Sequence, residues 1–397
     1  MNVVWLIQNL VPYHHARFEA FSKNEGVNAH LIQVTDKDDF SVLEFQPERQ
    51  DYQLHTLFPG RDRSAISTLD IAEQLEKKLS GINPDCACVS GWGMVIGQRL
   101  QAWALARRIP VVMFSESTTH DEPRVFYKEW LKGVLVRNAS AALVGGASHR
   151  DYIHQLGMPS ESVFDGHNVV DGHYFSDPAG ARPEELPAWL ENEPYFAVCT
   201  RFGEKKNLPR LVRAYARYTE KCGSGNLDPA RLVLGGDGET RREVEAEIKA
   251  LNMQDKVTLL GSLGYRVLPW FYQHCSAFIH ASTTEQWGLV VNEAMAAGAP
   301  LLLSHRCGCA PDLLSENENG FGFDPFDESS IADTLLRFTK LGTAKQVAFG
   351  ACSRSRIQNW GAQRFADNLL KAVEHAMAVG PSRNSMPARL VLRVLDR

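Results

Sequence analysis

The sequence predicts an α/β protein built from two doubly wound domains, and three observations indicate this class. Short apolar runs, typical of strands buried in a parallel sheet, alternate with longer segments of helical period. The alternation stops between residues 176 and 193 and then starts again. A chain of 397 residues has room for two or three domains of roughly 150 residues each.

The first half contains strands separated by helices. We expect strands at residues 2–8, 27–34, 85–90, 109–114 and 141–144. We expect helices at residues 14–23, 69–79, 95–107, 125–135 and 148–156. Strands and helices at this spacing predict βαβ units, with a parallel sheet covered on both faces.

A linker composition marks the domain boundary. Residues 176–193 contain Pro178, Pro183, Pro187 and several glutamates, and no apolar run interrupts them. We therefore expect an N-terminal domain at residues 1–176 and a linker at residues 177–193.

The second half repeats the alternation and predicts a second domain at residues 194–360. Its expected strands are residues 195–200, 231–234, 257–260, 277–280 and 300–304. Its expected helices are residues 208–221, 239–251, 266–273, 289–297, 331–341 and 344–357, and a last helix follows at residues 361–379. Residues 380–397 have four arginines and one acid, which predicts a weakly ordered basic tail. Two Rossmann-like domains of this kind face each other across a cleft, and their ligands lie beyond the carboxyl ends of strands.

Composition excludes several classes of protein. Hydrophobic residues make up 44% and charged residues 22%, so the chain is not largely disordered. The net charge of −5 lacks the signature of a nucleic-acid-binding protein. The longest apolar run, residues 294–303, is shorter than the roughly 20 residues of a spanning helix. Without a basic n-region and a cleavage site, and with no C-x-x-C pair among its cysteines, the chain is expected in a reducing cytoplasm.

Two cations follow the first strand of the second half. Arg201 and Lys206 lie between that strand and a helix that opens at Leu208. Arginine, lysine and a helix N-terminus together suit a diphosphate, although an isolated turn of this kind is more often a solvated loop. The next strand ends in a glycine-rich turn at Gly236, which permits close approach of a ligand.

The most informative stretch is residues 285–300. Glu285 lies in a loop after a strand, a helix begins near Gly288, and Glu293 lies one to two turns into that helix. Gly298 and Pro300 then end the helix in the expected order. The free amides at the start of such a helix suit phosphate oxygens. Taken alone, the two carboxylates would be ordinary helix and loop acids.

These residues carry a family resemblance. The E-x7-E element from Glu285 to Glu293 resembles the donor signature of the retaining, nucleotide-sugar-dependent glycosyltransferases of family 4, which have the GT-B fold. Arg201 to Asn207, residues 234–238 and residues 319–321 match in order and spacing. Residues 168–175 before the linker match as well, so the resemblance covers roughly residues 141–341.

The resemblance implies a role for each matching residue. Arg201 and Lys206 would stabilise the diphosphate leaving group, and Glu285 would face the transferred sugar. Glu293 would accept hydrogen bonds from the ribose. The remaining donor contacts would come from Gly288, Leu289, Ser262, Leu263 and Gly236. The acceptor would bind the N-terminal domain, onto which the last long helix would cross back.

The N-terminal domain departs from the family pattern. The loop after the first strand lacks the usual glycines and instead leads into His14, His15 and Arg17. These residues either contact the acceptor or only begin a helix. A histidine common after residues 109–114 is replaced by Glu116, so Glu116 or His120 would contact the sugar.

No cofactor or metal is expected, because two cations and a helix end are able to neutralise a leaving diphosphate. The one DxD motif, Asp36 to Asp38, lies in a polar stretch and is not interpreted as a metal site.

Residues 124–137 predict a basic amphipathic helix with an apolar face of Val125, Leu131, Val134 and Leu135. Such a helix either packs on its own sheet or lies on the inner face of a membrane.

Three functions remain open. The leading hypothesis is a retaining, metal-independent glycosyltransferase that moves a sugar to a glycan or lipid-linked acceptor in bacterial surface polysaccharide or glycolipid synthesis. The second is a nucleotide-sugar epimerase on the same fold, and the third is a non-catalytic sugar-nucleotide-binding protein.

Overall fold

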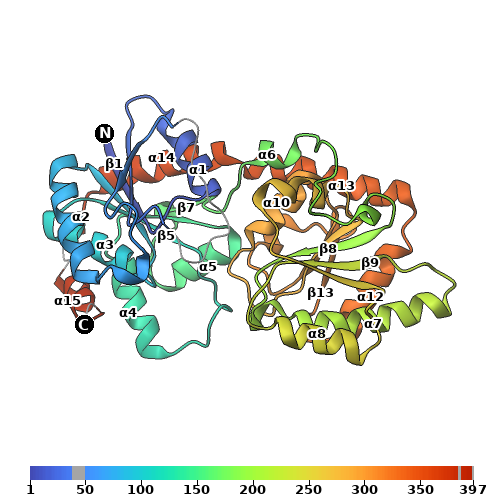
Figure 1. Ribbon diagram of the computed structural model, residues 1–397. Coiled ribbons are helices and arrows are strands. Elements are labelled where there is room, and N and C mark those ends of the chain that lie inside the picture. The colour runs from blue at the N-terminus through green and yellow to red at the C-terminus, as the bar shows by residue number, and fades with distance from the viewer. Residues whose placement is uncertain (38–49, 383–385, 396–397) are drawn as a thin grey trace. The chain divides into compact units, whose positions relative to one another are not determined.

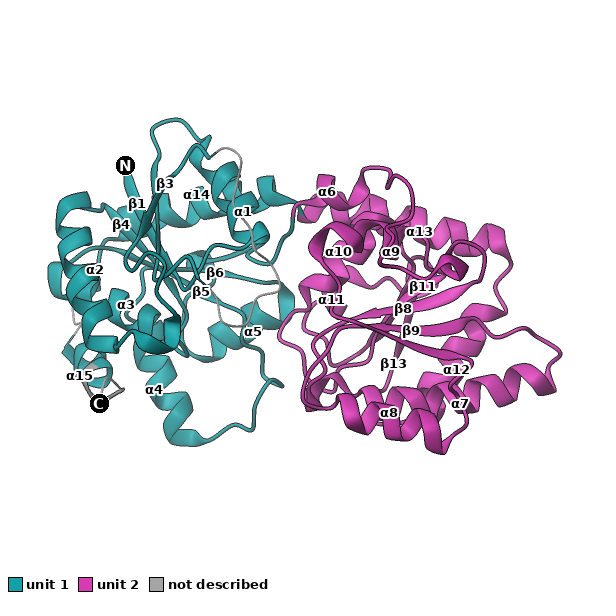
Figure 2. Cartoon of the chain, in the orientation of Figure 1, with its two compact units in different colours: residues 1–170, 361–397 teal, residues 171–360 magenta. Residues whose placement is uncertain are grey.

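The computed structural model describes residues 1–37, 50–382 and 386–395, without the side chains of residues 393–395 (Figure 1). The chain divides into two compact units (Figure 2). Unit 1 contains Met1–Val170 and Gly361–Arg397, and unit 2 contains Asp171–Trp360. Each unit is an α/β domain with one parallel sheet, as the sequence predicts.

Unit 1 has a seven-stranded parallel sheet in the order β3-β2-β1-β4-β5-β6-β7. Its strands are β1 (Asn2–Ile7), β2 (Asn28–Gln33), β3 (Gln53–Thr56), β4 (Cys86–Ser90), β5 (Val111–Ser115), β6 (Ala141–Val144) and β7 (Val163–Asp165). Its helices are α1 (Pro12–Ser22), α2 (Thr68–Ile82), α3 (Val95–Arg107), α4 (Phe126–Val136), α5 (Ala147–Gln155), α14 (Ala362–Val379) and α15 (Met386–Leu395).

Successive residues of β1 point to opposite faces of this sheet, and both faces are covered. Val4 and Leu6 join a core with Leu75 of α2 and Leu100 of α3. Val3 and Trp5 join a second core with residues of α1 and α14. Burial on both sides explains why the strand is apolar at nearly every position rather than at every second one.

Unit 2 has a six-stranded parallel sheet in the order β10-β9-β8-β11-β12-β13. Its strands are β8 (Tyr195–Cys199), β9 (Arg231–Gly235), β10 (Val257–Gly261), β11 (Ala277–His280), β12 (Leu301–Ser304) and β13 (Gly320–Phe323). Its helices are α6 (Gly172–Ser176), α7 (Leu208–Ser224), α8 (Arg241–Ala250), α9 (Leu268–Gln273), α10 (Leu289–Ala297), α11 (Ala310–Leu313), α12 (Glu328–Thr339) and α13 (Thr343–Ile357).

The boundary between the units lies at residue 170, before the expected linker. Residues 177–193 belong to unit 2, because their backbone is bonded to it. The Gln273 amide donates to the carbonyl oxygens of Phe175 and Asp177, and its oxygen accepts from the Ala179 N–H at 2.9 Å. Leu186 and Leu190 are buried as well. This proline-rich stretch is therefore an irregular segment packed within unit 2 and not a linker between the units.

The expected basic tail contains a helix. Within it, α15 packs on α3 and α4 of unit 1 and buries Ala388, Val391 and Leu392. These three apolar residues recur at helical spacing among the arginines, so the segment forms an amphipathic helix. The basic composition alone therefore did not indicate that the segment folds onto unit 1.

Candidate active site

Two loops at the carboxyl ends of β8 and β9 are tied together. The N–H of Thr200 donates to the Gly235 carbonyl at 3.0 Å, and the N–H of Phe202 donates to the Asp237 carbonyl at 2.8 Å. Arg201 lies exposed between these bonds, and Lys206 ends a single 3-10 turn, Glu204–Lys206, ahead of α7. The paired loops hold both predicted cations at the carboxyl edge of the sheet.

Gly236 is required where these loops meet. Its φ of +129° lies in the region that favours glycine. A Cβ on Gly236 would collide with the carbonyl oxygen of Thr200, directly beside Arg201. The sequence predicts that a ligand approaches the backbone closely at Gly236. The structure shows in addition that the backbone of Thr200 approaches Gly236 closely.

Glu285 is the centre of a polar cluster. It forms an ion pair with Lys206, and its Oε2 lies 2.9 Å from Nε2 of His280 and 3.3 Å from the hydroxyl of Ser282. Burial alone would raise the pKa of Glu285, but the bond to His280 and the charge of Lys206 lower it to about 2. Burial lowers the pKa of His280 itself, so at pH 7 the cluster holds an ionised Glu285 carboxylate beside an uncharged His280 ring.

The start of α10 lies beside this cluster. Gly288 caps the helix with a φ of +98°, and a Cβ there would lie 3.3 Å from Cγ of Glu285. Leu289 is the first helical residue, so its N–H belongs to the group that has no partner within the helix. Gly298 ends the helix at a φ of +89°, as the sequence predicts.

Glu293 lies near the side chains of Tyr272, Tyr265 and Cys199. Tyr272 donates a hydrogen bond from its hydroxyl to Oε2 of Glu293 at 3.1 Å. Burial raises the pKa of Glu293 to about 7. The hydrogen bond from Tyr272 lowers the pKa and so offsets part of the effect of burial. The carboxyl therefore changes charge near neutral pH, unlike Glu285.

The loop after β10 completes this part of unit 2. Ser262 is exposed and Leu263 is half-buried, and Leu263 packs against Gly235. In the same loop, Tyr265 stacks on Tyr174 with ring centroids 4.5 Å apart. Ser262 and Leu263 thus follow β10, which lies beside the strand that ends in the glycine turn. The stacked ring of Tyr265 comes two residues after Leu263 in the chain.

A second polar cluster, in unit 1, brings together three of the five predicted residues. Oε1 of Glu116 accepts from the amide of Asn168 at 2.9 Å and lies 3.3 Å from Nε2 of His167. Burial would raise the pKa of Glu116, but His167 and the charge of Arg17 lower it to about 2. Burial and Arg17 lower the pKa of His14 to about 3.

Arg17 is an internal cation. Its side chain is 1% exposed, and its Nε donates to the carbonyl of Val169 at 3.1 Å. Its guanidinium lies over the ring of Tyr13, 4.8 Å from the centroid. Its Nη2 is buried without a hydrogen-bond partner among the described residues. Such an atom is costly unless a ligand or water satisfies it.

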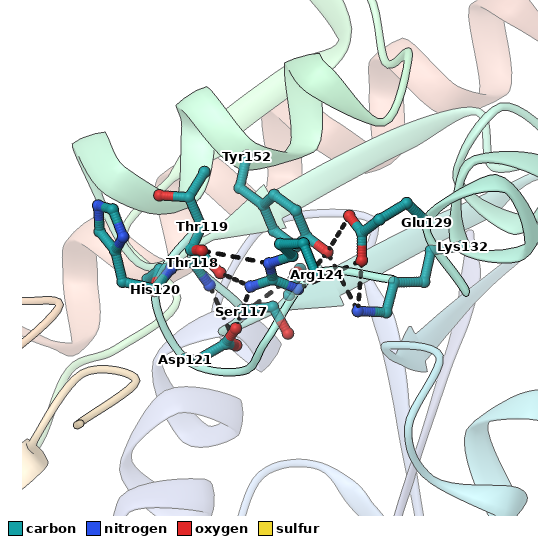
Figure 3. Close-up of polar contacts among 10 residues, drawn as sticks. Ser117, Thr118, Thr119, His120, Asp121, Arg124, Glu129, Lys132 and Tyr152 are labelled. Carbon is teal, nitrogen blue, oxygen red and sulfur yellow. Dashed lines mark hydrogen bonds and ion pairs between the residues drawn. The ribbon is translucent and has the colours of Figure 1, made fainter. Parts of the chain in front are cut away.

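His15 and His120 lie apart from this cluster. Nδ1 of His15 lies 3.0 Å from the Tyr52 hydroxyl, a contact that ties α1 to the segment before β3. His120 is exposed, and its ring projects away from the network of Figure 3. In that network Arg124 contacts Asp121, the carbonyls of Thr118 and Thr119 and the hydroxyl of Tyr152. The network fixes the loop that follows Glu116.

Helix α4 exposes a different apolar set from the one predicted. Val134 and Leu135 are buried in the core of unit 1 and Leu131 packs against it, so this predicted face covers the sheet. The exposed apolar side chains are Phe126 at 86%, Tyr127 at 60% and Trp130 at 55%. Of the two alternatives for the predicted apolar face, packing on its own sheet is the one observed for Leu131, Val134 and Leu135, and the helix has further apolar residues on its exposed face.

Sequence reasoning missed several members of the two clusters. His280, Ser282 and Tyr272 contact the predicted carboxylates in unit 2, and His167 contacts Glu116 in unit 1. A polar residue ending an apolar strand was the available signal for His280. Tyr272 lies within an aromatic helix and had no such signal.

Two further observations concern metals and membranes. Over residues 1–37, 50–382 and 386–395, no group of three or more His, Cys, Asp and Glu side chains is placed to hold a metal ion. Asp38, which ends the DxD motif, lies outside the described residues. Within the same ranges no helix combines the length and apolar character that crossing a membrane requires.

Comparisons with known proteins agree with this geometry. Residues 184–355 match the family described as Glycosyl transferases group 1. An alpha-D-kanosaminyltransferase of Streptomyces kanamyceticus is 24% identical over 212 residues, which are 53% of each chain. The chain spans about half or less of the length of the first curated relatives that it matches.

Solved structures share the fold over nearly the whole chain. A sucrose-phosphate synthase from Thermosynechococcus elongatus superposes with a TM-score of 0.73 at 17% identity, covering 95% of this chain and 99% of that one. Anabaena Alr3699/HepE in complex with UDP-glucose superposes with a TM-score of 0.69 at 16% identity, covering 94% and 99%. The chain therefore has the GT-B fold, and its residues 184–355 match the group 1 glycosyltransferases.

Proposed function

We propose that this protein is a retaining, metal-independent glycosyltransferase that uses a nucleotide sugar. The observation that carries the proposal is the cluster in unit 2, where Lys206 and Glu285 pair beside the start of α10. Structural neighbours were solved with UDP and UDP-glucose, which supports a nucleotide sugar as the donor. No cofactor is part of the proposal.

Arg201 and Lys206 would act on the leaving group. As the bond between the sugar C1 and the diphosphate oxygen breaks, the electron pair moves onto the diphosphate. Two side-chain cations and the amides of Gly288 and Leu289 would stabilise that charge in place of a metal. Preorganised charges of this kind are effective because the protein does not need to reorganise during the reaction.

Transfer would occur on one face of the sugar. The acceptor hydroxyl oxygen forms the new bond to C1, and its proton passes to the departing phosphate oxygen. The anomeric configuration is therefore kept. The ionised Glu285 would stabilise positive charge that develops on the sugar, and His280 would hold its carboxylate in place.

Glu293 would bind the donor rather than react. Its ionised carboxylate accepts hydrogen bonds from the ribose hydroxyls, while Tyr272 fixes one of its oxygens. The loop at Ser262 and Leu263 would meet the base, and Gly236 would let the backbone approach the diphosphate.

Unit 1 would bind a glycan or lipid-linked acceptor. Its cluster of buried Arg17, buried His167 and partly exposed Glu116 supports a polar acceptor site at the carboxyl end of β5. Contact with the inner face of an anionic membrane is supported by the exposed aromatic side chains of α4, which are Phe126, Tyr127 and Trp130. Exposed Lys128 lies beside them in the sequence. A cytoplasmic role in surface polysaccharide or glycolipid synthesis is part of this proposal.

The test is a thermal-shift panel of nucleoside diphosphates and their sugars, followed by turnover assays with crude glycan and lipid acceptors. We expect one sugar nucleotide to stabilise the protein and its turnover to rise with acceptor. Conversion of the donor to an epimer without acceptor would favour the epimerase. Binding without turnover in any acceptor fraction would favour the non-catalytic protein.

Membrane contact has its own test. Co-sedimentation with vesicles containing anionic lipid should capture the wild-type chain and not the triple variant F126S/Y127S/W130S. Vesicles of neutral lipid are the control. Equal sedimentation of both chains, or none of either, would contradict the contact.

A further inference from the structure

Unit 1 has a row of polar side chains where its core would be expected. Alternation along β1 and β2 puts Asn2 and His30 on the same face as the core residues Val4 and Ile32. The register pairs Asn2 with Asn28 and His30 with Gln53, so the row crosses three strands.

The amides of this row are bonded in series. Gln53 donates from Nε2 to Oδ1 of Asn28 at 2.7 Å, and Asn28 donates from Nδ2 to Oδ1 of Asn2 at 2.9 Å. Asn2 in turn donates to the carbonyl of Ile82 at 3.1 Å. Polar side chains ordered in this way form a preorganised surface.

This row forms one wall of a cavity of about 680 Å³, which we call the strand-start pocket. Helix α2 supplies the opposite wall through Gln74, Lys77, Lys78 and Gly81. Its volume lies in the range of roughly 300–1,000 Å³ typical of small-molecule sites. Every charged residue in the described lining is a lysine, and Glu73 lies beyond it, paired with Lys77 at 2.7 Å.

Two histidines, His30 and His55, belong to the lining. Nδ1 of His30 lies 3.1 Å from Nε2 of His55, and the rings stack with an interplanar angle of 12°. His30 is 5% exposed, and its Nε2 has no hydrogen-bond partner among the described residues. Burial lowers the pKa of both rings. The positive charge of Lys78 also contributes at His55, whose pKa falls to about 4.

The tautomers of this pair decide what His30 offers. At neutral pH both rings are uncharged, so one nitrogen of the contact donates and the other accepts. When His55 donates, Nε2 of His30 carries a hydrogen that a ligand oxygen is able to accept. A buried nitrogen left without a partner is costly, which favours an occupant.

We propose that the strand-start pocket binds a small phosphorylated polyol, at a site separate from the donor site of unit 2. The lysines, together with the lack of a carboxylate among the described lining residues, select an anion over a cation. The amides of Asn2, Asn28 and Gln53 donate and accept, which suits hydroxyl groups. The pocket starts where β1 and β2 begin, whereas Glu116 follows the carboxyl end of β5 in the same unit.

Gly81 and Lys78 allow a sharp test. A Cβ on Gly81 meets nothing within 4 Å, so Gly81→Phe places a ring at the pocket without a backbone clash. Lys78→Gln removes one lining charge and keeps a long polar side chain. Lys371→Gln, an exposed lysine on α14, is the matched control.

The experiment is calorimetric titration of the full chain with glucose 6-phosphate, glucose and inorganic phosphate. We expect glucose 6-phosphate to bind at least about tenfold more tightly than glucose or inorganic phosphate. Gly81→Phe should abolish that binding and Lys78→Gln should weaken it about tenfold, while Lys371→Gln leaves it unchanged.

Two controls separate this site from the others. Lys206→Ala should leave glucose 6-phosphate binding intact, and both pocket variants should bind the sugar nucleotide as the wild type does. The proposal is overturned if glucose 6-phosphate fails to bind at millimolar concentration, or if Gly81→Phe binds it normally. Loss of binding in Lys206→Ala would place the ligand in unit 2 and would also overturn the proposal.

Discussion

Lys206 and Glu285 form an ion pair although 79 residues separate them in the chain. The pair joins the loop after β8 to the loop after β11, two strands that are neighbours in the sheet. A carboxylate therefore holds the lysine at the carboxyl edge of the sheet, where the proposed function requires a cation. Lys206 in turn helps to keep Glu285 ionised in this mostly buried site.

Removing the lysine should impair catalysis more than donor binding. Lys206→Ala is expected to lower kcat by about 100- to 1,000-fold, because one preorganised charge on the leaving group is lost. Steady-state kinetics with the donor identified by the panel measures this. Lys205→Ala is the matched control, since Lys205 is exposed in the same turn, and it should keep wild-type turnover. Equal loss in both variants would contradict the assigned role.

Donor affinity should rise with pH through the titration of Glu293. Its pKa is raised to about 7, so the carboxyl is mostly protonated at pH 6 and mostly ionised at pH 8. Because the ionised form accepts hydrogen bonds from ribose, the Kd of the nucleotide sugar should fall between these values. Calorimetric titration of Glu293→Gln should give weak affinity that does not vary with pH. A pH-independent wild type would contradict the ribose role.

The same carboxyl should lower stability at high pH. The folded protein holds this proton up to about pH 7, whereas the unfolded chain releases it near its usual pKa of about 4.3. Stability is therefore lost as pH rises from about 4 to about 7, by up to about 4 kcal/mol. Glu293→Gln should raise Tm relative to the wild type at pH 8 and much less at pH 5. Glu220→Gln, at an exposed position of α7, should show no such difference.

The buried cation of unit 1 should depend on Glu116. Glu116→Gln leaves the charge of Arg17 uncompensated and should cost about 1–2 kcal/mol. This is less than a fully buried pair would lose, since the Glu116 side chain is 40% exposed. Denaturant unfolding measures the change. The double variant R17M/E116Q should recover part of the loss, and simple additivity of the two single variants would contradict the coupling.

The glycine turn should tolerate no side chain. Gly236→Ala drives a Cβ into the Thr200 carbonyl beside Arg201 and should lower both Tm and donor affinity. Gly180→Ala is the control, because a Cβ there meets nothing within 4 Å. Differential scanning calorimetry and donor titration of the two variants test this, and equal behaviour of both would contradict the requirement.

The sequence predicted the strands that are apolar throughout, because burial on both faces leaves a continuous apolar run. It missed β3, whose residues Gln53 to Thr56 are mostly polar at the edge of the sheet. It also missed β7 and β13, a three-residue strand and a strand half of whose residues are glycine. Edge strands and short strands leave too weak a pattern to be recognised without their neighbours.

The candidate site was predictable where a local motif carries it. Glu285, Gly288 and Glu293 lie within one loop and one helix, so their spacing is visible in the sequence. The contacts of Glu285 with His280 and of Glu293 with Tyr272 depend on chain packing instead. The burial of Arg17 depends on Val169 and Phe365, which are distant in sequence, and no local pattern indicates it.

The central claim is transfer of a sugar from a nucleotide donor with help from Lys206. The most direct measurement is release of nucleoside diphosphate from the stabilising sugar nucleotide, with and without the acceptor fraction, in wild type and Lys206→Ala. We predict release that rises with acceptor, an anomeric configuration kept in the product, and a loss of about 100-fold or more in the variant. Release that is independent of acceptor, or equal in wild type and Lys206→Ala, would contradict the claim.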